Sequence, residues 1–145
     1  MTQSKTGVPR GFKRLFRSSP FLELIGPLYY RPRKSGFVVA LRAADKHCNA
    51  RGLVHGGVLM TLADIALGYR LATQENPPAA LSTASLTTDF VDSARRGDWL
   101  EAHVDIQKLG GRLAFANAYI VCGGKRIARA SGVFARLKAE KKSEL

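Results

Sequence analysis

Acidic residues are scarce in this chain of 145 amino acids, which has 11 Asp and Glu against 23 Lys and Arg and a net charge of +12. A strongly basic surface attracts polyanions. Three classes of partner therefore stay open: nucleic acid, an acidic membrane surface, and a small molecule that bears phosphate groups. Charge alone does not choose among them.

Cysteines and long apolar runs are also scarce. Cys48 and Cys122 form neither a disulfide framework nor a CxxC pair, which favours a reducing, cytoplasmic setting. No run reaches the ~18 uncharged apolar residues that a membrane span needs. The stretch “FLELIGPLYY” carries Glu23 and lacks the cleavage site of a signal peptide. Walker A, GxGxxG and GxSxG motifs are absent, so no cofactor and no serine nucleophile are expected.

Hydrophobic residues make up 46% of the chain, which is enough for one folded domain. We expect that domain over residues 20–137, after a basic, flexible N-terminal segment (1–19) and before a charged tail (138–145). A short helix is expected from about Phe12, with Pro20 as a break in it.

Periodicity and turn residues predict one long helix and six strands. Two extended runs flank the turn sequence “RPRKSG” (31–36), which indicates a hairpin. The apolar stretch from Gly56 to Tyr69 predicts a helix that ends before the paired prolines. Four further strands begin at Leu81, Trp99, Leu113 and Lys125. The expected architecture is α+β: a curved six-strand antiparallel sheet, with the last four strands in a meander, around one long helix.

One carboxylate, Asp64, interrupts the apolar helix, and His55-Gly56-Gly57 stand at its start. A buried carboxylate must be paired, hydrated or protonated, so Asp64 is either a hydrogen-bonded structural residue or a base or nucleophile in an apolar cleft. Free amide groups at a helix N-terminus stabilise negative charge, and glycine lets a ligand approach them. The tripeptide suits an oxyanion hole for acyl transfer, or a loop that needs glycine.

The length of the helix sets a condition on any shared site. Asp64 follows Gly56 by eight residues, or ~12 Å along the axis at 1.5 Å per residue. One carbonyl carbon cannot lie ~3 Å from both groups. If both act on one substrate they come from different chains, which predicts a dimer of antiparallel helices with two shared sites.

The segment “NARGLVHGGVLMTLAD” (49–64) resembles the signature of hotdog-fold acyl-CoA thioesterases, and most of all the phenylacetyl-CoA thioesterase-like branch. The stretches “PFLELIGPLYY” (20–30) and “STASLTTDFVDSARRGD” (82–98) resemble the family's first helix and strand and the strand after the central helix. The resemblance covers residues 20–137. It implies hydrolysis of an acyl-CoA thioester by a homodimer, with a dimer of dimers as a further option.

The resemblance also implies roles for five residues. Asp64 would be the general base or the nucleophile, and the Gly56 amide would hold the thioester oxygen. His55 and Asn49 would orient or polarise the thioester, and Thr83 would position the water. Asp64 and Thr83 would belong to one chain, and Asn49, His55 and Gly56 to its partner.

The remaining expectations concern how the substrate is bound. Arg95 and Arg96 are the first candidates for coenzyme A phosphates, with Arg51 and Arg129 as weaker ones, although all could equally be solvated surface charges. The acyl pocket is expected between helix and sheet, with Leu59, Met60 and Phe90 on its wall. No nucleic acid is expected as a partner.

Other chemistries have weaker support. A thiol nucleophile at His47-Cys48 lacks a third group, and His47, Cys48 and His55 lack the ligand spacing of a metal site. Two alternatives stay open: a non-catalytic hotdog domain that binds an acyl-CoA or a polyanion, and a hotdog hydratase. The order Asn, His-Gly-Gly, Asp favours the thioesterase over the hydratase.

Overall fold

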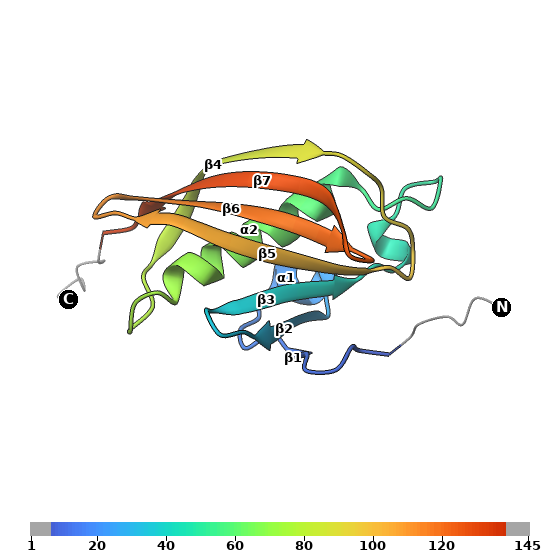
Figure 1. The fold of residues 1–145 in the computed structure, drawn as a ribbon, viewed down its shortest axis with the longest axis horizontal. Coiled ribbons are helices and arrows are strands. Elements are labelled where there is room, and N and C mark those ends of the chain that lie inside the picture. The colour runs from blue at the N-terminus through green and yellow to red at the C-terminus, as the bar shows by residue number, and fades with distance from the viewer. Residues whose placement is uncertain (1–6, 139–145) are drawn as a thin grey trace, which may run out of the picture.

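The computed structural model describes residues 7–138, which form one curved antiparallel sheet wrapped around a long helix (Figure 1). The expected tail, 138–145, lies outside the described residues apart from Lys138. The elements are β1 (Lys13–Arg14), α1 (Pro20–Ile25), β2 (Leu28–Pro32), β3 (Phe37–Arg42), a single 3-10 turn (Asp45–His47), α2 (Gly56–Ala72), β4 (Leu81–Phe90), β5 (Trp99–Leu109), β6 (Leu113–Cys122) and β7 (Lys125–Arg136). The α+β class and the long helix are confirmed.

The sheet has seven strands where six were predicted, in the order β1-β2-β3-β5-β6-β7-β4. The predicted hairpin is β2–β3, and β5, β6 and β7 follow one another as a meander. The prediction that β4 also belongs to this meander is wrong, because β4 pairs with β7 at the far edge. Local periodicity finds a strand but does not encode its neighbour, which depends on long-range packing.

The N-terminal segment also differs from its prediction. Phe12 begins no helix: residues Lys13–Arg14 pair with β2, and the Phe12 ring packs edge-on against Trp99 at a centroid distance of 5.0 Å. Pro20 does not break a helix but starts α1, where its fixed φ suits the first position and its missing N–H costs nothing. The Ser19 side chain caps this helix by accepting from the Leu22 N–H at 3.3 Å.

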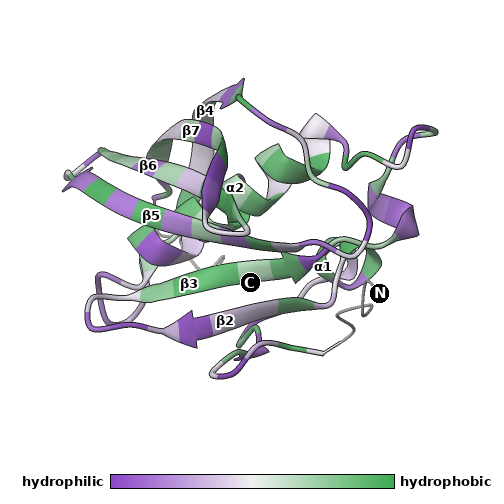
Figure 2. Ribbon diagram, turned by 45° about the vertical axis from the view of Figure 1, so that its right-hand side comes forward, coloured by the Kyte–Doolittle hydropathy of each residue, from purple (hydrophilic) through white to green (hydrophobic). Residues whose placement is uncertain are grey.

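The core lies between α2 and the concave face of the sheet. Figure 2 shows α2 and β3 as predominantly hydrophobic, whereas β5 alternates. Four leucines of α2 are at most 2% exposed: Leu59, Leu62, Leu67 and Leu71. Asp64 lies on the side of α2 next to β4, the edge strand of the sheet.

Candidate active site

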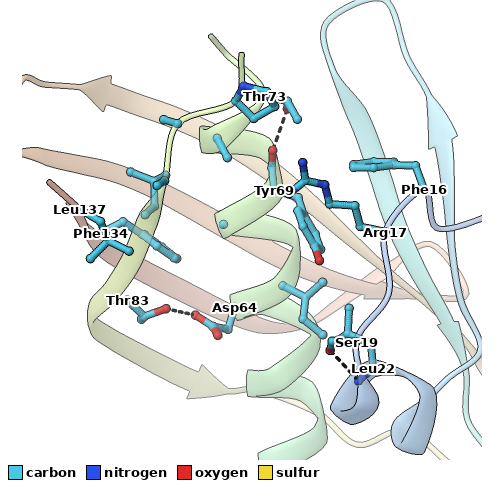
Figure 3. A pocket seen from close by; sticks show the side chains of 17 residues that line it. Phe16, Arg17, Ser19, Leu22, Asp64, Tyr69, Thr73, Thr83, Phe134 and Leu137 are labelled. Carbon is cyan, nitrogen blue, oxygen red and sulfur yellow. Dashed lines mark hydrogen bonds between the residues drawn. The ribbon is translucent and has the colours of Figure 1, made fainter. Parts of the chain in front are cut away.

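Asp64 and Thr83 are in direct contact (Figure 3). The Thr83 hydroxyl, on β4, donates a hydrogen bond of 2.7 Å to Asp64 Oδ1 on α2. The register of β4 against β7 shifts between Thr83 and Ser85, and such a bulge re-aims side chains. Asp64 is half-buried, and no described residue donates a hydrogen bond to its second oxygen, Oδ2.

Two cavities meet at this pair. The larger has a volume of about 710 Å³, and its wall includes three aromatic rings, those of Phe16, Tyr69 and Phe134. The smaller, of about 240 Å³, is lined by Phe21, Met60, Thr61 and Leu86 besides the pair itself. Asp64 is the only carboxylate among the described residues that line either cavity. A carboxylate thus stands in largely apolar surroundings, the setting in which it can act as a base or a nucleophile.

The N-terminus of α2 presents backbone donors without acceptors. His55 is the N-cap residue, with extended backbone (φ −59°, ψ 138°), and its side chain makes no capping bond. Within residues 7–138 the Gly56 and Gly57 N–H groups donate to no acceptor. The Phe90 ring covers Gly56 so closely that a Cβ there would lie 3.1 Å from Phe90 Cζ. These amides could therefore hold a small anionic oxygen.

Asn49 shapes the loop before this helix. Its side-chain oxygen accepts from the Arg51 and Leu53 N–H groups, at 2.9 and 3.2 Å. The oxygen is thus engaged in the loop, and the amide NH₂ is the part of Asn49 that could face a substrate. Because α2 is continuous from Gly56 to Asp64, the two ends stay ~12 Å apart along the axis in one chain.

The other predicted residues lie in different surroundings. Leu59 is 2% exposed in the core and lines neither cavity, Met60 lines the smaller one, and Phe90 lies against Gly56 with half its surface exposed. Arg95 is exposed, whereas Arg96 forms an ion pair of 2.8 Å with Asp45. The hydrogen bond to Asp45 raises the pKa of Arg96. Of the weaker candidates, Arg51 is exposed and Arg129 pairs with Asp89 at 2.6 Å.

The sequence did not predict the residues that form most of the larger cavity. Ile65, Gly68, Tyr69 and Ala72 line it from a broad stripe of the helix that begins at Asp64, since at about 3.6 residues per turn they all lie on one side of the helix axis. This spacing is the signal that could have identified them. Phe16 gives no such signal, since its place depends on how the N-terminal segment folds back.

The thiol and metal alternatives gain no support from the structure. His47 is buried; its Nδ1 accepts from the Ala44 N–H at 2.8 Å, so its Nε2–H donates to the Ile25 carbonyl at 2.5 Å. The Cys48 thiol contacts the Ala44 carbonyl at 3.4 Å. Burial, and then the charge of Asp98, raise the pKa of Cys122 to about 11, so this thiol stays protonated. Among residues 7–138 no metal-binding cluster and no helix fit to cross a membrane is found.

Comparison with known proteins identifies the family and the fold neighbours of this chain. Residues 51–128 match the family model described as Thioesterase superfamily. A Pseudomonas aeruginosa protein named provisionally as an esterase is 52% identical over 128 residues, covering 88% of this chain and 96% of its own. The phenylacetic acid degradation protein PaaI of Thermus thermophilus, solved as a mutant, is 28% identical with a TM-score of 0.72, covering 82% of this chain and 100% of its own.

A Bacillus halodurans protein solved with CoA is 23% identical with a TM-score of 0.73, covering 83% of this chain and 78% of its own, and shows the fold alone. The expected hotdog fold is therefore confirmed, with a phenylacetic acid degradation protein among its structural neighbours. The chain belongs to the thioesterase superfamily.

Proposed function

We propose that this protein hydrolyses an acyl-CoA thioester to the free acid and coenzyme A. The observation that carries the proposal is the Thr83–Asp64 hydrogen bond at the wall of an aromatic-lined cavity. The same helix has N-terminal amides that donate to no acceptor in the part of the chain that the structure describes. Family membership supports thioester hydrolysis in general, and the fold neighbour solved with CoA indicates that such a ligand fits this fold.

In the proposed reaction Asp64 either takes the proton of a water that attacks the thioester carbonyl carbon, or attacks that carbon itself. In both routes the carbon–sulfur bond breaks and coenzyme A leaves as a thiolate that takes up a proton. The second route leaves an anhydride on Asp64, which water opens to the free acid. Both routes need the ionised carboxylate, which Thr83 orients through one oxygen. The carbonyl oxygen gains negative charge as the tetrahedral intermediate forms. The Gly56 amide would stabilise that charge, with His55 and Asn49 beside the thioester.

The site is proposed to be shared within a homodimer. β4 is the outer edge of the sheet; it is ten residues long, and most of its side chains are exposed. An uncovered strand edge of this length is a template for pairing with another chain. Two β4 strands paired about a two-fold axis would set the α2 helices antiparallel and bring the partner's Gly56 toward Asp64. A dimer of dimers remains a prediction.

The acyl group is proposed to occupy the larger cavity, and Arg95 and Arg96 stay the candidates for the coenzyme A phosphates. The free thiols of Cys48 and Cys122 fit the predicted cytoplasmic setting.

The direct experiment is a panel of acyl-CoA thioesters with aryl-acetyl, aroyl and straight-chain acyl groups, assayed by release of free coenzyme A thiol. We expect turnover of at least one class. Failure to cleave any of them, together with nucleic-acid binding that falls steeply with salt, would favour the non-catalytic binder.

Phe16 is expected to limit the size of the acyl group. Its ring contacts Tyr69 at a centroid distance of 5.6 Å and forms part of the cavity wall, so Phe16→Ala should extend the cavity toward solvent. For the longest acyl groups, we expect kcat/KM, divided by its value for the best wild-type substrate, to be about tenfold higher in the variant than in the wild type. The reason is that each extra buried CH₂ contributes ~0.8 kcal/mol. The matched control is Leu24→Ala, because Leu24 is 72% exposed and lines neither cavity. An unchanged selectivity profile would place the acyl group elsewhere.

A further inference from the structure

A third cavity, of about 270 Å³, lies beside the last turns of α2 at Arg70 and shares no lining residue with the two cavities at Asp64. Its wall comes from the β2–β3 loop, the last turn of α2 and the middle of β5. The described residues that line it include no carboxylate and three permanent cations: Arg33, Lys34 and Arg70. The proposed thioester chemistry uses none of these residues.

Arg70 is a buried cation with no anionic partner among the described residues. Its side chain is on the wall of this cavity, and the residue is only 5% exposed. Among residues 7–138 its guanidinium donates to no acceptor and has no carboxylate oxygen within 4.0 Å. Burial lowers the pKa of Arg70, with no charged partner opposing that effect. Charges buried this far in native proteins are normally paired, and no acidic side chain among the described residues pairs with Arg70.

The surrounding residues make room for this guanidinium. It lies over the Phe37 ring, 5.6 Å from the centroid, and against Gly36. Gly36 has a φ of +81°, and any Cβ there would collide with Arg70. Packing against an aromatic face fixes the plane of the guanidinium without using its N–H groups. Those donors remain available to a ligand in the cavity.

A second cation is oriented by β5. Arg33 Nη1 donates to His103 Nδ1 at 3.0 Å, so the His103 Nε2–H donates to Glu101 Oε1, also at 3.0 Å. Glu101 in turn accepts from Trp99 Nε1 at 3.1 Å and lies 4.0 Å from Arg31. The nearby Glu101 carboxylate is thus engaged by His103, Trp99 and Arg31, and among the described residues it forms no ion pair with Arg33 or Arg70.

We propose that this cavity is a second, separate binding site, and that its ligand is a phosphate or diphosphate group. Two guanidinium groups and one ammonium around a small cavity match the charge and the bidentate acceptor geometry of phosphate oxygens. The volume accommodates one or two phosphate groups, so a nucleotide would bind by its phosphates with the remainder outside. Arg33, Lys34 and Arg70 belong to the chain's excess of basic over acidic residues, and the proposed acyl-CoA site uses none of them.

The test is thermal unfolding and calorimetric titration with inorganic phosphate, pyrophosphate and ADP, at an ionic strength held constant with sodium chloride. We expect the Tm to rise with at least one of them. A response to phosphate or pyrophosphate identifies the free anion as sufficient, and a response to ADP alone identifies a nucleotide. No response beyond the chloride control overturns the proposal.

Arg70→Met distinguishes a ligand-binding residue from a structural one. Removing an unpaired buried charge should raise the Tm of the ligand-free protein and weaken the Kd for the bound anion at least tenfold. The matched control is Arg126→Met, whose guanidinium lies over the Tyr119 ring on the surface and which should retain the wild-type Kd. A lower ligand-free Tm in Arg70→Met, with the Kd unchanged, overturns the proposal.

A second variant tests the proposal even if Arg70→Met fails to fold. Arg33 and Lys34 are exposed loop residues, so the double variant Arg33→Gln, Lys34→Gln should keep the wild-type Tm and still lose at least tenfold in affinity. Wild-type affinity in this double variant would likewise overturn the proposal. None of these readouts depends on thioesterase activity.

Discussion

Asp64→Asn is expected to lower kcat for thioester hydrolysis by about 10²–10⁴-fold, the usual contribution of a general base. The amide neither takes a proton from water nor attacks a carbonyl carbon. It is nearly the same size as the carboxylate, and its oxygen can still accept the Thr83 hydroxyl hydrogen bond. The measurement is kcat on the best acyl-CoA substrate, with size-exclusion chromatography to confirm the oligomer.

Thr83→Val is expected to lower kcat less than Asp64→Asn does. It keeps the side-chain volume and removes only the hydroxyl that orients Asp64. We expect kcat to fall roughly tenfold, which corresponds to the free energy of one hydrogen bond to a charged group. If Asp64→Asn keeps kcat within tenfold of wild type, or if Thr83→Val is the more damaging of the two, Asp64 does not perform the chemistry.

Gly56→Val is expected to lower kcat by about 10²–10³-fold, the effect of losing one oxyanion donor. The backbone amide remains, but the added Cβ lies 3.1 Å from Phe90 Cζ and the two methyl groups shield the amide from a substrate oxygen. Phe90 is half-exposed and can move, so the fold should survive. Because the donor acts mainly in the transition state, kcat should fall more than KM rises.

Gly57→Ala is the matched control, since a Cβ at Gly57 would meet no atom within 4 Å. The kcat of Gly57→Ala should stay within about threefold of the wild-type value, because alanine is accepted in the first turn of a helix and leaves the Gly56 amide open. Equal losses in the two glycine variants would indicate a general disturbance of the helix start and would remove the argument for an oxyanion hole at Gly56.

Features that neighbouring residues determine were predicted correctly, and features that depend on contacts between distant residues were not. The strands that begin at Leu81, Trp99, Leu113 and Lys125 all start where predicted, because turn residues and alternation are local. The partner of β4 and the path of residues 12–19 were predicted wrongly, because both depend on tertiary contacts such as Phe12 on Trp99. Propensity carries no information about those contacts.

The candidate site shows the same division. The chemical pair Asp64 and Thr83 was predicted from a motif, and the structure places the two side chains in contact. The wall of the cavity was not predicted, because a helix that is apolar on nearly every face does not reveal which face meets the sheet. Leu59, which was predicted on the pocket wall, lies in the core, and Ile65, Gly68 and Tyr69 line the cavity instead.

The central claim is that each active site takes Asp64 from one chain and Gly56 from its partner. It is tested most directly by refolding Asp64→Asn and Gly56→Val chains together in equal amounts. Half of the dimers would then be mixed, and each mixed dimer would hold one site with neither lesion, so activity should return to about one quarter of wild type. If each site lay within one chain, every site would keep a lesion, and a mixture no more active than its two components would contradict the account.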